Sequence, residues 1–310
     1  MTQYSGKLFP AFALLAVTFG GGCSMRTLAV NQLGNALAAG GTTFASDDDP
    51  ELVGGALPFS LKLMESLLAE SPEHAPLLVA TSRGFTQYAY GWVGPAADDD
   101  GETGEAARER SKRLYLRGRD YGMRALAVSI DNFRVRFAVN PRAAVALARK
   151  RDVPALYWTA AAWGMAISSG KDDLDLVADL PVVEALISRA AELEPGFDEG
   201  AIDTFLISFE AARSGMSKDA AAQARKHFHR AVEQSRGESA APFVAAAEAL
   251  AIPDQNRAEF EKLLSDALAI DPNVRPEWRL QNILAQRRAR WLLAHHDDLF
   301  IESAPKEEDQ

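Results

Sequence analysis

Aromatic side chains at helical spacing are the first residues of this chain that could form a ligand site. Phe85, Tyr88 and Trp92 lie at positions i, i+3 and i+7, so they share one face of a helix. Trp158 and Trp163 lie in a second segment in which small residues separate them. Aromatic faces most often fill a core, but small neighbours can also leave an apolar channel between helices. Both interpretations stay open at this point.

Three arginines stand near two tyrosines in the segment LYLRGRDYGMRAL. Arg117, Arg119 and Arg124 fall close to Tyr115 and Tyr121. Guanidinium groups bind carboxylates well, so these side chains could present cations to an acidic ligand. The alternative is a solvated helix face with local ion pairs, which is the more common arrangement.

The sequence offers no arrangement for catalysis. It contains no G-x-S-x-G elbow, phosphate-binding loop or dinucleotide motif, and neighbouring His295 and His296 diverge on a helix. Four acidic residues match positions 1, 3, 5 and 12 of a calcium loop: Asp98, Asp100, Glu102 and Glu109. Thr103 replaces the glycine that this loop needs, so the segment is better interpreted as an acidic helix start. We expect neither an enzyme, nor a metal site, nor a cofactor.

The first residues have the layout of an export signal. Lys7 precedes the apolar run 8–19, which fits a signal peptide and is shorter than the about 20 residues that cross a bilayer. Three glycines then lead to Cys23, the one cysteine of the chain. A small residue before cysteine resembles the lipobox of bacterial lipoproteins, although Gly20 stands where leucine is usual.

This resemblance implies that residues 1–22 are removed and that Cys23 is lipidated and tethers the chain to a membrane. Ser24 after the cysteine favours the outer membrane in that family. Plain secretion and a buried cysteine are the alternatives. An acylated Cys23 would leave no thiol for disulfides, thiolate zinc sites or cysteine catalysis.

The net charge of the chain limits the classes of partner that it can bind. The 310-residue chain has net charge −10, and the leader removes only Lys7, so the mature chain is more negative still. This argues against nucleic-acid binding, which needs clustered cations, and against electrostatic docking on anionic lipid. No later segment looks apolar and long enough to span a membrane, so we expect a soluble body on its anchor.

The rest of the chain reads as helices separated by Gly, Pro and Asp. The expected helices are 25–39, 51–70, 74–93, 103–128, 130–139, 141–149, 153–168, 180–193, 199–214, 217–235, 240–250, 255–270 and 277–297. They form one all-α domain over 23–302, with N-terminal helices at 25–170 and a repeat-rich half at 180–297. Residues 303–310 are expected to be a disordered acidic tail.

Internal repetition divides this domain. Four segments align without gaps, namely 60–72, 183–195, 224–236 and 260–272. Each has an apolar residue four positions on and a small or apolar residue three further, which places both on one helix stripe. Ala224, Phe228 and Ala231 best match the second helix of a tetratricopeptide repeat. The sequence therefore predicts stacked antiparallel helical hairpins in degenerate tetratricopeptide-like repeats, with a non-repetitive bundle as the alternative.

The combined features resemble the TatT family, the T component associated with tripartite ATP-independent periplasmic (TRAP) transporters. The resemblance rests on the lipoprotein start and on the segments GFTQYAYGWV (84–93), LYLRGRDYGMRAL (114–126) and LYWTAAAWG (156–164). It implies a periplasmic lipoprotein, a homotrimer with a pore. Its partners would be a solute-binding P component and a hydrophobic or organic-acid ligand.

Local inference assigns the ligand-lining residues, since the resemblance transfers none. The candidates are Phe85, Tyr88, Trp92, Tyr115, Arg119, Tyr121, Trp158 and Trp163. The alternative function is an envelope scaffold that binds peptides or proteins through a repeat groove. A transport accessory should enclose an apolar passage near these rings, whereas a scaffold should bury them and show an external groove.

Overall fold

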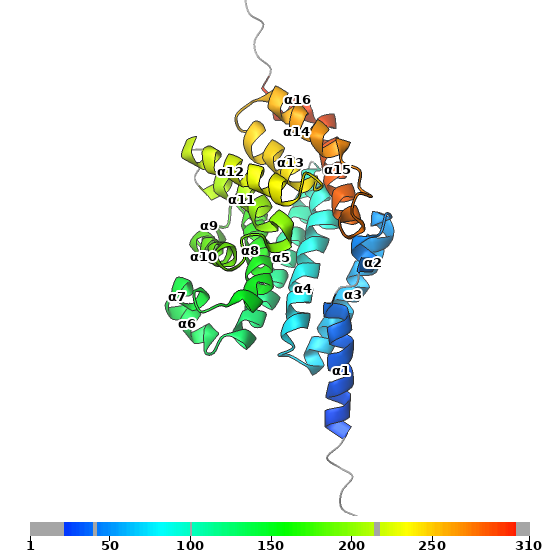
Figure 1. Cartoon of the computed structure of the whole chain (residues 1–310), viewed down its shortest axis with the longest axis vertical. Coiled ribbons are helices and arrows are strands. Elements are labelled where there is room, and N and C mark those ends of the chain that lie inside the picture. Colours follow the sequence, from blue (N-terminus) through cyan, green and yellow to red (C-terminus); the bar gives the residue numbers. More distant parts are fainter. Residues whose placement is uncertain (1–21, 40–41, 100, 214–217, 302–310) are drawn as a thin grey trace, which may run out of the picture.

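The computed structural model describes residues 22–39, 42–99, 101–213 and 218–301, and within these it is all-α (Figure 1). The expected leader, except Gly22, and the expected tail 303–310 lie outside the described residues, as does the side chain of Cys23. The first part contains α1 (Gly22–Ala38), α2 (Thr42–Ala45), α3 (Pro50–Glu70), α4 (Ala75–Tyr88), α5 (Gly101–Ser129), α6 (Phe133–Val139), α7 (Pro141–Val145), α8 (Val153–Ser169) and α9 (Leu174–Val177).

The second part contains α10 (Leu180–Leu193), α11 (Ala201–Arg213), α12 (Lys218–Gln234), α13 (Ala241–Ala246), α14 (Arg257–Ala269), α15 (Arg279–Ala294) and α16 (His296–Leu299). Short segments join them: π-helical η1 (Ala89–Val93) and η5 (Ala247–Ala251), and 3₁₀ segments η2 (Gly94–Asp98), η3 (Lys150–Asp152), η4 (Phe197–Gly200) and η6 (Pro276–Trp278). Each expected helix is present, while α2, α9 and α16 were not expected.

Helix starts follow local side chains. Asp49 caps α3 by accepting the N–H groups of Glu51 and Leu52, both at 3.0 Å, and Pro50 stands in the first turn. Helix α14 begins two residues later than the expected 255, because Asn256 caps it by accepting the N–H group of Glu259 at 3.1 Å. Asp179 precedes α10 but makes no capping bond; its carboxylate accepts from Trp163 Nε1 at 3.2 Å.

Helix α3 contradicts the expectation that no segment after the leader is apolar and long enough to span a membrane. By length and composition alone it is apolar enough to cross a membrane, with a mean hydropathy of 1.3 in its best window. Its Val53, Leu61 and Leu68 side chains are buried, and the helix packs against α1, α4 and α15. Leu52 and Phe59 on the same helix are exposed.

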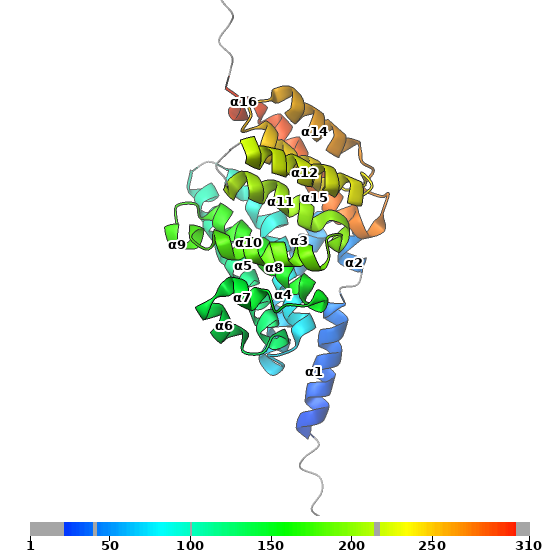
Figure 2. The ribbon, with the colours of Figure 1, turned by 60° about the vertical axis from the view of Figure 1, so that its left-hand side comes forward.

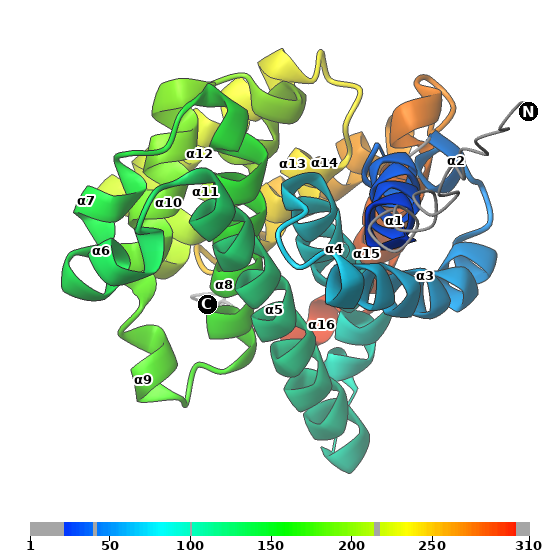
Figure 3. The same ribbon diagram turned by 90° about the horizontal axis from the view of Figure 1, so that it is seen from below.

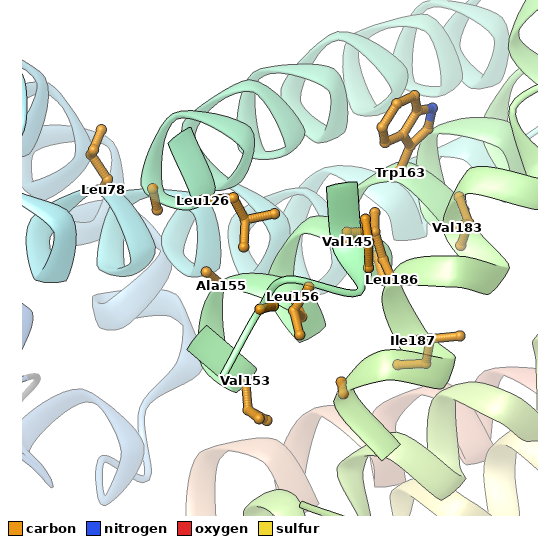
Figure 4. Close-up of a cluster of buried hydrophobic side chains, with 14 of the residues drawn as sticks. Leu78, Leu126, Val145, Val153, Ala155, Leu156, Trp163, Val183, Leu186 and Ile187 are labelled. Carbon is orange, nitrogen blue, oxygen red and sulfur yellow. The ribbon is translucent and has the colours of Figure 1, made fainter. Parts of the chain in front are cut away.

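Two hydrophobic cores organise the molecule. The first gathers side chains from α3, α4, α5, α8 and α10, and Figure 4 shows part of it around Leu126, Leu156 and Leu186. The second gathers side chains from α11 to α15, and Figure 2 shows α11 and α12 side by side in this region. Most stripe positions of the four aligned segments pack in these cores or against them, for example Ile187, Ala190 and Leu264. Ala231 is buried outside both cores. The tetratricopeptide-like arrangement itself stays a prediction.

The end of the domain returns to its beginning. Arg279 donates to the backbone oxygen of Ser46 at 2.8 Å, and Arg287 pairs with Glu51 at 2.8 Å. Helix α15 also packs against α2 and α3, next to which it lies in Figure 3. These closing contacts join the two parts into a ring of helices.

Candidate functional site

A cavity of about 130 Å³ lies between the two parts of the chain, enough for several water molecules. It is lined by Gln87, Tyr157, Trp158, Asp198, Glu199, Gly200, Ala201, Thr204, Ser235, Ser239, Ala241, Pro242, Trp278 and Gln281. These residues come from α4 and α8 on one side and from η4, α11, the connection between α12 and α13, α13, η6 and α15 on the other. The cavity is therefore a product of the closed ring.

The turn between α10 and α11 supplies the cavity's two carboxylates. Asp198 and Glu199 both adopt the left-handed backbone conformation, with φ of 47° and 45°, and Gly200 follows with φ of 108°. Such conformations cost on the order of 1 kcal/mol or more for residues other than glycine. Arg275 anchors the turn through two 2.7 Å hydrogen bonds to Glu199. Strain retained beside a cavity points to a functional role for this turn.

Both π-helical segments contribute to a charged cluster nearby. Arg288 of α15 donates to Glu248 of η5 at 2.8 Å and also pairs with Asp98 at the end of η2. Tyr90 of η1 lies within the electrostatic influence of Glu248 and Arg288. We call these four residues the Arg288 cluster. Because π-helical turns occur often at functional sites, the presence of one cluster residue on each of η1 and η5 marks this region as well.

Two tyrosines, one in the Arg288 cluster and one in the cavity wall, have raised pKa values. Tyr90 exposes 50% of its surface to water, yet burial raises the pKa of its phenol to about 12, with a contribution from Glu248. Burial also raises the pKa of Tyr157, and the fields of Asp198 and Tyr90 add to the shift. Tyr157 lines the cavity, whereas none of the four residues of the Arg288 cluster does.

Of the eight sequence-predicted residues, Trp158 lines the cavity. Its indole meets the Tyr157 ring edge-on at 5.0 Å. Three others are buried in packed regions: Phe85 is 3% exposed, Tyr115 1% and Trp163 6%. Trp163 lies among the apolar side chains drawn in Figure 4.

The remaining four make structural contacts on the first part of the chain. Tyr88 stacks on Trp92 at 6.3 Å, and Trp92 Nε1 donates to the backbone oxygen of Pro50 at 2.7 Å. Tyr121 donates to Glu65 at 2.8 Å. Arg119 pairs with neighbouring Asp120 at 2.7 Å. The eight predicted residues therefore do not line one common site.

Arg117, Arg119 and Arg124 of α5 all bind other groups of the protein. Arg119 also lies over the Trp163 ring at 4.9 Å. Arg117 pairs with Glu65 and covers the Phe85 ring at 4.7 Å, and Arg124 donates to the backbone oxygen of Pro72 at 3.1 Å. These contacts match the ion-paired helix face that was the alternative.

Sequence reasoning missed the acidic turn and the Arg288 cluster. Asp198 and Glu199 stand in a Pro-Gly-Phe-Asp-Glu-Gly turn, which offers a signal for a turn but none for a cavity. Trp278 ends η6 and Arg288 lies on α15, two elements far along the sequence from α4 and α8, so no local pattern connects them with the site. Among the described residues, no three His, Cys, Asp or Glu side chains gather as metal ligands. The arrangement is suited to binding a small molecule.

Comparison with known proteins gives the family. The model of the TRAP transporter T-component family matches residues 46–300. The chain is also 31% identical to a protein of Treponema pallidum (strain Nichols) described as uncharacterized, over 94% of this chain and 97% of that one. The family match spans most of the sequence, from before α3 to α16, and includes every element that lines the cavity. The chain belongs to the TRAP transporter T-component family, and it is an accessory component of TRAP transport in the cell envelope.

Proposed function

We propose that this protein is a lipid-anchored periplasmic component that holds a small organic ligand in its cavity and exchanges it with a solute-binding P component. The observation that carries the proposal is the cavity between the two parts of the chain, in a family of transport accessories. Aromatic walls remove water from apolar ligand surface, and the few polar groups orient the ligand. The protein binds and releases the ligand and transforms nothing.

The anchor is part of this proposal. The leader and Cys23 support lipidation at the outer membrane, and helix α1 begins at Gly22, beside that cysteine. Figure 1 shows α1 extending from the body toward the N-terminal end. An acyl chain on Cys23 would therefore hold the body away from the leaflet at the end of α1. The homotrimer rests on the family resemblance alone.

A scaffold without a small ligand is the second candidate. It is favoured by the burial of Phe85, Tyr115 and Trp163, because a scaffold needs these rings only as packing. The two candidates differ in what occupies the cavity. A transport accessory retains a molecule there, whereas a scaffold functions equally well when that space is filled by a side chain.

The experiment compares two glutamine-to-tryptophan variants. Gln87 is exposed and lines the cavity, so Gln87→Trp fills it from its rim; Gln223 is exposed on α12 and serves as the matched control in Gln223→Trp. The full chain is purified from membranes in detergent, and native mass spectrometry records bound small molecules and co-purified proteins. We expect a small molecule and a solute-binding protein with the wild type and Gln223→Trp, and loss of the small molecule with Gln87→Trp. Co-purified protein without any retained molecule in all three samples would support the scaffold.

A further inference from the structure

The wall of the cavity is aromatic and acidic. Tyr157, Trp158 and Trp278 contribute rings, and Asp198 and Glu199 contribute carboxylates, while no lysine or arginine is among its lining residues. Aromatic faces and carboxylates both attract cations. The lining by itself therefore favours a positively charged group over the carboxylate that an organic acid would present.

The two carboxylates differ in their partners. Glu199 is neutralised by Arg275, which also lies over the Trp278 ring at 3.9 Å. Asp198 accepts no hydrogen bond and forms no ion pair with the residues that the structure describes. The residue is exposed to solvent, but partial loss of hydration beside the wall raises the pKa of Asp198, and the field of Arg83 opposes this shift without an ion pair. Asp198 is the free anionic group of the wall.

Arg83 supplies the opposite charge. It lies one turn before Gln87 on α4, and residues four apart share a helix face, so Arg83 is on the face that carries a lining residue. Its half-buried guanidinium forms no ion pair or hydrogen bond with the described residues, and burial lowers its pKa. Asp198 and Arg83 thus carry opposite charges that influence each other without forming an ion pair.

We infer that the cavity binds a compact organic zwitterion, with its ammonium group between the aromatic rings and Asp198 and its carboxylate toward Arg83. This inference rests on the proposed ligand-binding function and names the ligand class. A zwitterion presents an opposite charge to both Asp198 and Arg83, whereas a simple anion would be repelled by Asp198 and a simple cation would be repelled by Arg83. The left-handed turn holds Asp198 in the wall, and Arg275 fixes that turn through Glu199.

The test uses three probes that differ in charge and little in shape. Glycine betaine carries both charges, choline lacks the carboxylate, and 3,3-dimethylbutanoate replaces the ammonium centre by carbon. Each is titrated by calorimetry into the detergent-solubilised full chain. We expect betaine to bind at least about tenfold more tightly than the other two probes, because choline and 3,3-dimethylbutanoate each lack one of the two charged contacts.

Variants locate the contacts. Asp198→Asn keeps the shape, and asparagine tolerates the left-handed conformation, so folding is retained while betaine affinity falls at least about tenfold. Arg83→Gln should remove the preference for betaine over choline. Asp266→Asn is the matched control, since Asp266 lies on α14 and pairs with Lys262. It should bind as the wild type does.

Two results would overturn the inference. Equal binding of betaine and 3,3-dimethylbutanoate, or unchanged betaine binding in Asp198→Asn, rejects the zwitterion but leaves a ligand cavity in place. Absence of binding by all three probes rejects it too. In that case, a molecule that native mass spectrometry detects in the wild type and not in Gln87→Trp would still support the proposed ligand-binding function. If no molecule is detected in the wild type either, the proposed function is rejected as well.

Discussion

Replacing Gly122 by alanine tests the close packing that holds α5 against α8. A Cβ atom at Gly122 would lie 2.1 Å from Thr159 Oγ1 and 3.1 Å from Ser82 Oγ. Ordinary contacts begin near 3.4 Å, so the helices would have to separate or Thr159 would have to rotate. Rotation breaks the 2.6 Å hydrogen bond from Thr159 Oγ1 to the backbone oxygen of Ala155.

The expected loss combines three contributions. Overpacking costs about 1–3 kcal/mol, and the lost hydrogen bond costs about 1 kcal/mol. Alanine gains about 1 kcal/mol over glycine in a helix. The free energy of unfolding of Gly122→Ala should therefore fall by about 1–3 kcal/mol, which lowers Tm by about 2–4 °C for each kcal/mol.

The assay is urea unfolding followed by circular dichroism, with Gly55→Ala as the matched control. Gly55 lies exposed on α3 with nothing within 4 Å of its would-be Cβ, so this variant should gain about 1 kcal/mol. Adding Thr159→Ala to Gly122→Ala should restore part of the loss, because the nearest atom is gone. If Gly122→Ala is stabilised as Gly55→Ala is, the close approach of α5 and α8 is refuted.

Three further predictions concern the site and its support. Trp163→Ala should lose about 3–5 kcal/mol of stability in a denaturation experiment, because the ring is 6% exposed in the first core. Trp158→Ala should lose less stability, but calorimetry should show a larger loss of ligand affinity, because Trp158 lines the cavity. Equal losses in the two variants would contradict this. Asp198→Gly should raise the free energy of unfolding by up to about 1 kcal/mol by relieving the left-handed conformation, while abolishing betaine binding; a lower Tm would argue against strain. Arg275 lowers the pKa of Glu199 in the folded protein below its ordinary 4.5. The pair therefore stabilises the fold above pH 4.5, and this stabilisation is lost as the pH falls through the lowered pKa of Glu199. Glu199→Gln should therefore flatten the acid limb of a Tm-against-pH curve, and an unchanged limb would show that the pair contributes nothing.

The helices could be predicted because their signals are local. Asp49 with Pro50 marks the start of α3, and the apolar stripe through Val183 and Ile187 faces the core as its spacing requires. The start of α14 was misplaced by two residues, because both Asp254 and Asn256 are good caps and only tertiary contacts choose between them. Local chemistry thus defines elements better than their ends.

The site could not be predicted in the same way. The aromatic rings of the GFTQYAYGWV segment and of LYLRGRDYGMRAL attract attention, yet Phe85 and Tyr115 are buried in packed regions. The glycines between the aromatic residues have a packing role, since Gly118 and Gly122 let α5 approach α4 and α8. By contrast, Asp198, Trp158 and Trp278 line one cavity although they lie on distant segments of the sequence. No spacing along the sequence encodes such a meeting.

The closing contacts also determine when the cavity can exist. Arg279 and Ser46 are 233 positions apart, and Arg287 and Glu51 are 236 apart. Contacts of such high sequence separation carry the largest loop-closure entropy, so they form late, after each core has assembled locally. The pocket is accordingly completed in the final step of folding, and any cargo inside it stabilises the finished ring over its separate halves.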